Sequence, residues 1–235
     1  HHHARPQSPR MGCAGSKGAP EPTTAEPSVL RTVGYRSVDG KSVEHLKAFY
    51  ESELKAKFDG GLKPEDKIVL SFSDEGVVAS FIFSSMASKE AYLTGLRAEL
   101  MSLPGLTDNM DVKAPFPPDE TMPIGYTHGS VSTTGLARYC KYKVADGKSA
   151  EYVALFETMK TVIPKIKGLT YFAVSAPAGA TDMMCFMILE DEKAVATYNA
   201  TMREELIEMM KGTFDLTGPA KGAQYLIEAP IFTVH

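Results

Sequence analysis

The sequence predicts an α+β protein that contains two tandem copies of one βαββαβ unit. Residues 39–44 (DGKSVE) recur 107 positions later as residues 146–151 (DGKSAE). Further matches keep the same order along the chain: 96–100 with 202–206, and 113–115 with 228–230. Each half also alternates, in the same order, between the two-residue period of a strand and the longer period of a helix. Together these observations indicate an internal duplication.

The first strand and first helix of the unit are clearest in the second half. Residues 138–144 place apolar or aromatic side chains on one face and mostly lysines on the other, as expected of a half-buried strand. Ser149 is expected to cap a helix that runs to about Ile163, where Pro164 disturbs it. The first half repeats this pattern, with Ser42 before the helix.

The later elements follow the same order in both halves. Residues 169–174 predict a second strand, and 183–189 predict a third that is apolar on both faces and therefore central in a covered sheet. Residues 77–83 are its counterpart in the first half. Asp191 and Ser88 are expected to cap the second helices. The remaining boundaries are helix ends near Gly105 and Gly212 and final strands over 109–113 and 224–228.

A βαββαβ unit forms a ferredoxin-like, four-stranded antiparallel sheet with both helices on one face. The other face needs a cover, so we expect the two antiparallel sheets to pack as one intramolecular α/β barrel. Residues 119–135 are assigned as a linker because prolines, glycines, serines and threonines accumulate around them. The predicted division is 1–10 tag or upstream remnant, 11–28 disordered tail, 29–118 first repeat, 119–135 linker and 136–235 second repeat.

Composition excludes some classes of function. Hydrophobic residues make up 43% of the chain, charged residues 23%, and the net charge is -4. No basic stripe is present to hold a phosphate backbone, so nucleic acid is not an expected partner. No apolar run approaches the roughly 20 residues that cross a bilayer. Three widely spaced cysteines fit a reducing compartment, which predicts a cytoplasmic location.

The N-terminal region carries a lipidation pattern. The chain begins with three histidines, and residues 1–10 have the character of a tag remnant, so Met11 is the expected start. From Met11, a glycine in second place and a serine in sixth match the N-myristoylation pattern, and Cys13 can carry a palmitoyl chain. Because two acyl chains anchor a protein stably, we expect Gly12 and Cys13 to tether it to the cytoplasmic face of a membrane. The alternative is a soluble disordered tail.

Two stretches of the second half carry a family resemblance. Residues 165–172 (KIKGLTYF) have the form of a glycine-led second strand, and 184–194 (MCFMILEDEKA) that of an apolar third strand that runs into an acidic helix cap. In these features and their order the sequence resembles the antibiotic biosynthesis monooxygenase-like branch of the dimeric α/β-barrel superfamily. The resemblance implies an intramolecular version of that barrel.

The resemblance also implies a range of functions. They include cofactor-independent oxygenation of aromatic or quinol substrates, haem degradation, small isomerase or decarboxylase reactions, and binding without chemistry. For haem degradation, the resemblance implies a site built from Asn, Trp and His. The chain contains no tryptophan, which argues against that activity. We therefore expect a cofactor-free, monooxygenase-like protein for a small aromatic or lipophilic molecule. The alternative is a non-catalytic ligand-binding or scaffolding module at a membrane surface.

Enzymes of this family hold substrate between the sheet and the helices, which directs the choice of site residues. Tyr35 and Tyr142 occupy equivalent strand positions that are expected to face the helices, and His45 and Tyr152 occupy equivalent helix positions. Tyr35 and His45 are the catalytic candidates, since they could hold a phenolic substrate, stabilise an enolate or move its proton. The expected pocket residues are Tyr142, Tyr152, Phe49 and Phe156. The alternative is that the tyrosines are core residues and His45 is a solvated one.

Other chemistries lack their motifs. Beyond residues 1–10 the histidines are His45, His128 and His235, and no cluster has metal-ligand spacing, so no metal is expected. Glycine-rich nucleotide-binding motifs and the Gly-x-Ser-x-Gly nucleophile motif are absent from the sequence. The expected partners are a small apolar or aromatic ligand, a membrane and a further copy of the chain.

Overall fold

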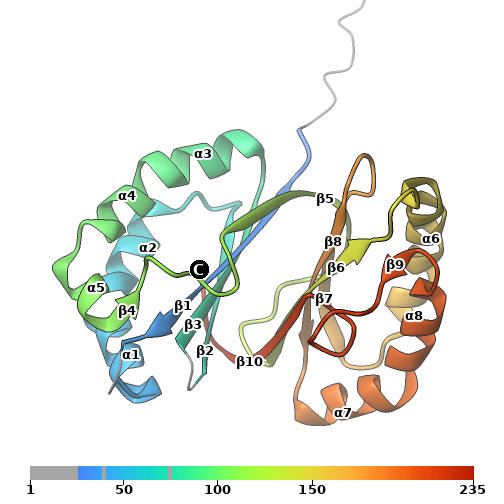
Figure 1. Ribbon diagram of the computed structural model, residues 1–235. Coiled ribbons are helices and arrows are strands. Elements are labelled where there is room, and N and C mark those ends of the chain that lie inside the picture. Colours follow the sequence, from blue (N-terminus) through green and yellow to red (C-terminus); the bar gives the residue numbers. More distant parts are fainter. Residues whose placement is uncertain (1–25, 39–40, 74–75) are drawn as a thin grey trace, which may run out of the picture.

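The computed structural model describes residues 26–38, 41–73 and 76–235. The expected acylation sites Gly12 and Cys13 lie outside these residues. Figure 1 shows helices on two opposite sides of the molecule, with the strands between them. No helix in the described part of the chain is long and apolar enough to cross a membrane.

The first half begins with a strand and a long helical segment. Its elements are β1 (Val29–Ser37), α1 (Val43–Phe49), the π-helical turn η1 (Tyr50–Leu54), α2 (Lys55–Gly61), β2 (Lys67–Ser73), β3 (Gly76–Phe83), α3 (Met86–Thr94), α4 (Leu96–Met101), α5 (Pro104–Asn109), β4 (Met110–Asp111) and β5 (Glu120–Gly129). Ser42 caps α1 as predicted, since its side chain accepts a hydrogen bond from the His45 amide at 3.2 Å. The predicted Ser88 cap is wrong. Ser85 has the extended backbone that a cap needs and accepts from the Ser88 amide at 3.1 Å.

The second half repeats this order with fewer breaks. Its elements are β6 (Leu136–Val144), α6 (Ser149–Val162), the 3₁₀ turn η2 (Ile163–Lys165), β7 (Leu169–Ser175), β8 (Asp182–Leu189), α7 (Glu192–Thr201), α8 (Arg203–Met210), β9 (Phe214–Asp215) and β10 (Tyr225–Val234). The Asp191 cap is confirmed by its 2.7 Å bond from the Ala194 amide. The Ser149 cap is wrong because the helix begins one residue earlier. The carbonyl of Lys148 accepts the first helical bond, from the Tyr152 amide at 2.9 Å.

The strands form one closed antiparallel sheet. Their order is β10-β2-β3-β1-β5-β7-β8-β6, and β6 pairs in turn with β10, so that eight strands complete a barrel-like ring. The short strands β4 and β9 lie beside β1 and β6. The two expected sheets are therefore joined edge to edge by hydrogen bonds, which leaves no free edge in the ring.

Strand β5 corrects the predicted linker over residues 119–135. It pairs with β1 as far as Pro123 and with β7 from Ile124 onward. In the same way, β10 pairs with β6 as far as Pro230 and with β2 from Ile231 onward. A proline has no amide hydrogen, and it is tolerated here because each strand changes its partner at that point. Pro123, one of the prolines that suggested a loop, therefore marks one crossing between the halves, and Pro230 marks the other.

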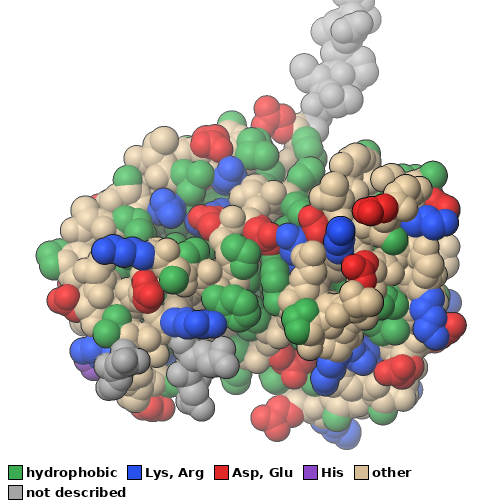
Figure 2. All heavy atoms as spheres, in the orientation of Figure 1, with side chains coloured by type: hydrophobic (Ala, Val, Ile, Leu, Met, Phe, Trp, Pro, Cys, Tyr) green, Lys and Arg blue, Asp and Glu red, His purple; other side chains and the backbone are tan. Residues whose placement is uncertain are grey.

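Three apolar clusters fill the part of the molecule that the structure describes. One lies inside the barrel and includes Leu30, Tyr139, Tyr171, Phe186 and Ile188. The others lie between the sheet and the helices of the first and second halves. Outside, among the described residues on the face shown in Figure 2, acidic and basic side chains are interspersed without a broad area of one sign.

Buried tyrosines predict a loss of stability in alkali. Burial raises the pKa of Tyr171 and of Tyr198 to about 12, whereas an unfolded tyrosine ionises near pH 10. Above about pH 10 the unfolded chain therefore binds fewer protons than the folded one, so the free energy of unfolding falls as pH rises towards about 12. Urea unfolding across this range should show the decline, and Tyr171→Phe should make it shallower. An unchanged slope in that variant would contradict the assignment.

Candidate functional site

Each half encloses a cavity between the sheet and its helices. The first-half cavity measures about 70 Å³ and the second-half cavity about 30 Å³. A water needs roughly 10–15 Å³, and a cavity of about 150 Å³ holds benzene. The first-half cavity thus has room for a few non-hydrogen atoms, and a larger ligand must displace side chains. Its lining includes Arg31, Val33, Tyr35, Tyr50, Ala79, Phe81, Tyr92, Arg97, Leu100 and Met101.

The alternation of β1 determines which side chains enter the first-half cavity. Arg31, Val33 and Tyr35 point to the helix side, while Leu30 belongs to the cluster inside the barrel. Strand β3 contributes Phe81, directly opposite Arg31 in the strand register. The helical segments η1, α2, α3, α4 and α5 cover the other side of the cavity.

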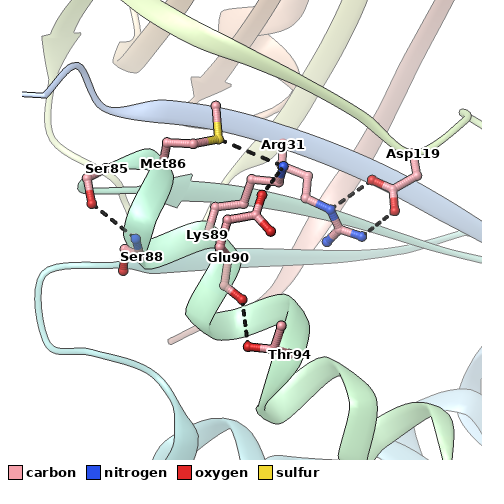
Figure 3. A network of polar contacts seen from close by, with 8 residues as sticks. All are labelled: Arg31, Ser85, Met86, Ser88, Lys89, Glu90, Thr94 and Asp119. Atoms are coloured by element: carbon pink, nitrogen blue, oxygen red, sulfur yellow. Dashed lines mark hydrogen bonds and ion pairs between the residues drawn. The ribbon is translucent and has the colours of Figure 1, made fainter.

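Arg31 carries a buried positive charge that is paired with a carboxylate. Figure 3 shows its side chain extended from β1 towards Asp119. Its Nε and Nη2 atoms donate to the two carboxylate oxygens of Asp119 at 2.8 and 2.6 Å. The guanidinium carbon lies 4.8 Å from the centre of the Phe81 ring, a cation–π distance. Arg31 is only 1% exposed, so the ion pair and the ring are what make this charge tolerable in the core.

The tyrosines of this cavity supply neutral hydroxyl groups. Burial raises the pKa of Tyr50 and of Tyr92 well above the ordinary value, so both remain protonated near neutral pH. The Tyr50 hydroxyl contacts Nε2 of His235, whose Nδ1 atom lies 2.6 Å from Asp59. No histidine is among the described residues that line either cavity. The described lining of the first-half cavity therefore offers the positive charge of Arg31 and neutral tyrosine hydroxyls, without a histidine base.

The second-half cavity has a related lining. Arg138, Tyr142, Tyr198 and Arg203 correspond to Arg31, Tyr35, Tyr92 and Arg97, at spacings of 106 or 107 positions. Cys140 and Cys185 lie opposite each other on β6 and β8, in place of Val33 and Ala79 on β1 and β3. Methionines such as Met159 and Met187 also line this cavity. Because methionine is flexible, it adapts readily to irregular space.

The structure separates the two residues proposed as catalytic. Tyr35 lines the first-half cavity, as Tyr142 lines the second. His45 is exposed on α1, its Nε2 atom is 2.5 Å from Asn109 Oδ1, and it lines an outer groove together with Phe49. Tyr35 and His45 therefore border different hollows. No group of three or more His, Cys, Asp or Glu side chains in the described ranges is placed to hold a metal ion.

The other two expected pocket residues are core residues. Tyr152 is 0% exposed, and its hydroxyl donates to the Ser175 carbonyl at 3.2 Å. Phe156 is 4% exposed and packs edge-on against the Tyr152 ring. Neither belongs to the lining of the second-half cavity. Tyr152 and Phe156 therefore pack as core residues, which for Tyr152 is the alternative given in the sequence analysis.

The arginines are the site residues that sequence analysis missed. Continuing the two-residue period of β1 backwards from Tyr35 and Val33 reaches Arg31, and the same step in β6 reaches Arg138. A charged residue at an inward strand position, repeated 107 positions later, was the available signal. Arg97 and Arg203 lie within the matched stretches 96–100 and 202–206.

Comparisons with known proteins place the fold. No protein-family model matches the sequence, and no curated protein matches it. Solved structures do match, among them an anthrone oxidase-like protein at 10% identity and a TM-score of 0.58, covering 89% of this chain and 93% of the other. A candidate monooxygenase from Fusobacterium nucleatum matches at 8% identity with the same coverage and TM-score.

A third structure names the wider group. It is an uncharacterized ferredoxin fold protein related to antibiotic biosynthesis monooxygenases, from Listeria monocytogenes, with 10% identity and a TM-score of 0.51. The match covers 90% of this chain and 98% of that one, so it spans both halves. The protein described here thus has the α+β, ferredoxin-type fold of monooxygenase-related proteins, and at these identities the likeness establishes the fold.

Proposed function

We propose that the protein binds a small molecule in the first-half cavity and acts as a cofactor-independent monooxygenase on a small aromatic or lipophilic substrate. The observation that carries the proposal is a cavity with aliphatic and aromatic walls that also presents a buried guanidinium, that of Arg31. Concave apolar sites with a few placed polar groups are typical of ligand pockets. The names of the structural neighbours support the choice of oxygenation.

The lining indicates how such a reaction would be assisted. Oxygenation without a cofactor needs an electron-rich substrate, such as the anion of a phenol or hydroquinone. Arg31 can stabilise charge on its oxygen, because a fixed donor in a dry site is effective electrostatically. The described cavity has no histidine base, so the proposal favours substrates that ionise easily. Oxygen uptake with hydroquinones is the direct assay, and no uptake with any member of such a series counts against catalysis.

A non-catalytic ligand-binding or scaffolding module is the second candidate. It is favoured by the separation of His45 from Tyr35 and by the smaller, methionine-rich second-half cavity. This candidate predicts ligand binding without turnover. Native mass spectrometry of protein purified from its source or a close expression host is the first measurement, because a co-purified small molecule would identify a ligand class.

We also propose that the chain is a tandem duplication that forms an intramolecular dimeric α/β barrel. Support comes from the equivalent crossings of β5 and β10 and from the paired lining residues of the two cavities. On this view the first repeat extends through β5. A chimera in which the sequence of β10 replaces that of β5 should still fold if the two strands are copies of one element. Failure of this chimera to fold would count against the duplication.

Membrane attachment through Gly12 and Cys13 is a further part of the proposal, supported by the sequence pattern alone. Co-expression of a chain that starts at Met11 with an N-myristoyltransferase should add one myristoyl mass. Gly12→Ala is the control, because it removes the acceptor. An unmodified Gly12 in the parental chain would refute myristoylation.

Ala79→Leu is expected to weaken ligand binding about tenfold or more. Ala79 lines the first-half cavity and is 8% exposed, so added methyl groups occupy the space that a ligand needs. Binding of phenol, followed by ligand-observed NMR, is the measurement. Ala48→Leu makes the same change on the exposed face of α1 and should leave binding unaltered. Equal phenol binding by both variants would place the site elsewhere.

A further inference from the structure

Two arginines flank each cavity, one from a strand and one from a helix. In the first half they are Arg31 on β1 and Arg97 on α4. In the second half they are Arg138 on β6 and Arg203 on α8. The helix arginines are 106 positions apart, and the strand arginines 107. The same pair of charges is therefore placed at two equivalent sites.

The first-half pair is incompletely satisfied. Nη1 of Arg31 and Nε of Arg97 are buried and have no hydrogen-bond partner among the described residues. Arg31 is 1% exposed, so this donor cannot turn to bulk water. A buried donor without an acceptor is unfavourable, and most such groups in folded proteins are paired. An acceptor bound in the cavity would satisfy them.

The charge of the site points to the kind of acceptor. The carboxylate of Asp119 accepts both bonds from Arg31, and one of its oxygens lies 3.8 Å from Nη2 of Arg97. Two guanidinium groups thus share one carboxylate, which leaves one positive charge in excess. A ligand with one negative charge would neutralise the site.

The second half holds its arginine pair with different anchors, and each arginine there has its own carboxylate partner. Arg138 donates to Asn199 at 3.0 Å and to Glu228 at 3.3 Å. Nε of Arg203 is buried without a described partner, like Nε of Arg97. The other groups of Arg203 contact the exposed Glu204 and the Lys221 carbonyl. The anchors differ between the halves, whereas the unpaired Nε of the helix arginine is common to both.

We propose that the first-half cavity binds a small organic anion, with its carboxylate or phenolate oxygen at Nη1 of Arg31 and Nε of Arg97. The apolar part of the anion lies against Val33, Ala79 and Leu100, which line the same cavity. This inference rests on the proposed function, because it takes the first-half cavity as the ligand site. It goes further by assigning the ligand a negative charge. The volume of about 70 Å³ favours a compact anion, and a ring requires displacement of a flexible side chain such as Met101.

Carboxylates and their amides provide matched probes, since they have the same number of non-hydrogen atoms and differ in charge. Propionate with propionamide, and benzoate with benzamide, are titrated into the full chain and followed by NMR. The carboxylates are expected to bind about tenfold or more tightly, because hydrogen bonds to charged groups are the stronger ones. Ala79→Leu should weaken binding of the carboxylates.

Arg97→Gln tests the donor, since Arg97 is a third exposed and its replacement leaves the Arg31–Asp119 pair in place. The carboxylate preference should fall to about one in this variant. It should survive in Arg36→Gln, a charge control that removes an exposed arginine which does not line the cavity. Arg97→Lys, which keeps the charge, should retain part of the preference. Circular dichroism establishes that each variant is folded.

The outcomes separate this inference from the proposed function. If amides bind as well as carboxylates and Ala79→Leu blocks both, the cavity is a ligand site and the anion assignment is overturned. If the carboxylate preference is unchanged in Arg97→Gln, the anion is held elsewhere and the inference also fails. If no probe binds and native mass spectrometry finds no ligand, the proposed function itself is contradicted.

Discussion

Phe186→Ala is expected to lower the free energy of unfolding by about 3–5 kcal/mol. Phe186 is 0% exposed at the centre of β8, inside the barrel, where its ring lies 6.1 Å from that of Tyr171. In the register it stands between Ala173 on β7 and Tyr139 on β6. Because hydrogen bonds close the sheet on every side, the surrounding strands can move inward only slightly, so most of the vacated volume would remain as a cavity.

Urea unfolding of the purified variant is the measurement. A loss of this size is a large part of the stability of an ordinary domain, so Phe186→Leu, which leaves a smaller void, should be measured in parallel. Val153→Ala removes methyl groups from a side chain that is 45% exposed on α6 and should change stability by no more than about 0.5 kcal/mol. A similarly small change for Phe186→Ala would mean that the barrel interior is not tightly packed.

The order of helices and strands was predictable because it depends on local signals. The apolar stretch 183–189 became β8 almost unchanged, and Asp191 capped the next helix. Ring closure was harder, since the pairing of β5 with β7 and of β10 with β2 depends on contacts between distant segments. Residues 119–135 were expected to form a linker partly because proline is usual in loops. Only the sheet reveals that Pro123, the proline of β5, lies at a change of partner.

The site residues also differ in whether local sequence patterns or contacts between distant segments determine their positions. The helix-facing direction of Tyr35 followed from its register with Val33, because a strand has only two faces. The edge of a helical stripe is less decisive, and His45 turned to Asn109 instead of the cavity. Arg31 was missed because arginine is usually exposed, and the carboxylate that makes its burial tolerable is 88 positions away in the presumed linker. A buried ion pair of this kind becomes visible only when the fold is known.

Asp119→Asn is expected to lower the free energy of unfolding by about 3 kcal/mol or more. The amide keeps the shape of the side chain but not its charge, so Arg31 would remain 1% exposed without a counter-charge, and Arg97 would lose its nearest carboxylate oxygen, at 3.8 Å. Glu51→Gln is the matched control. Its pair with Lys55 is about half exposed on both sides, and such pairs contribute roughly 0–1 kcal/mol.

The same variant links stability to ligand charge. With Asp119 neutral, the first-half cavity carries two uncompensated guanidinium groups, so benzoate should raise the melting temperature of Asp119→Asn by more than that of the parental chain, and benzamide should not. Thermal unfolding over a series of ligand concentrations makes the comparison. If Asp119→Asn were as stable as the parental chain, Arg31 would have to be hydrated or paired elsewhere, and the argument for an excess positive charge in the cavity would fail with it.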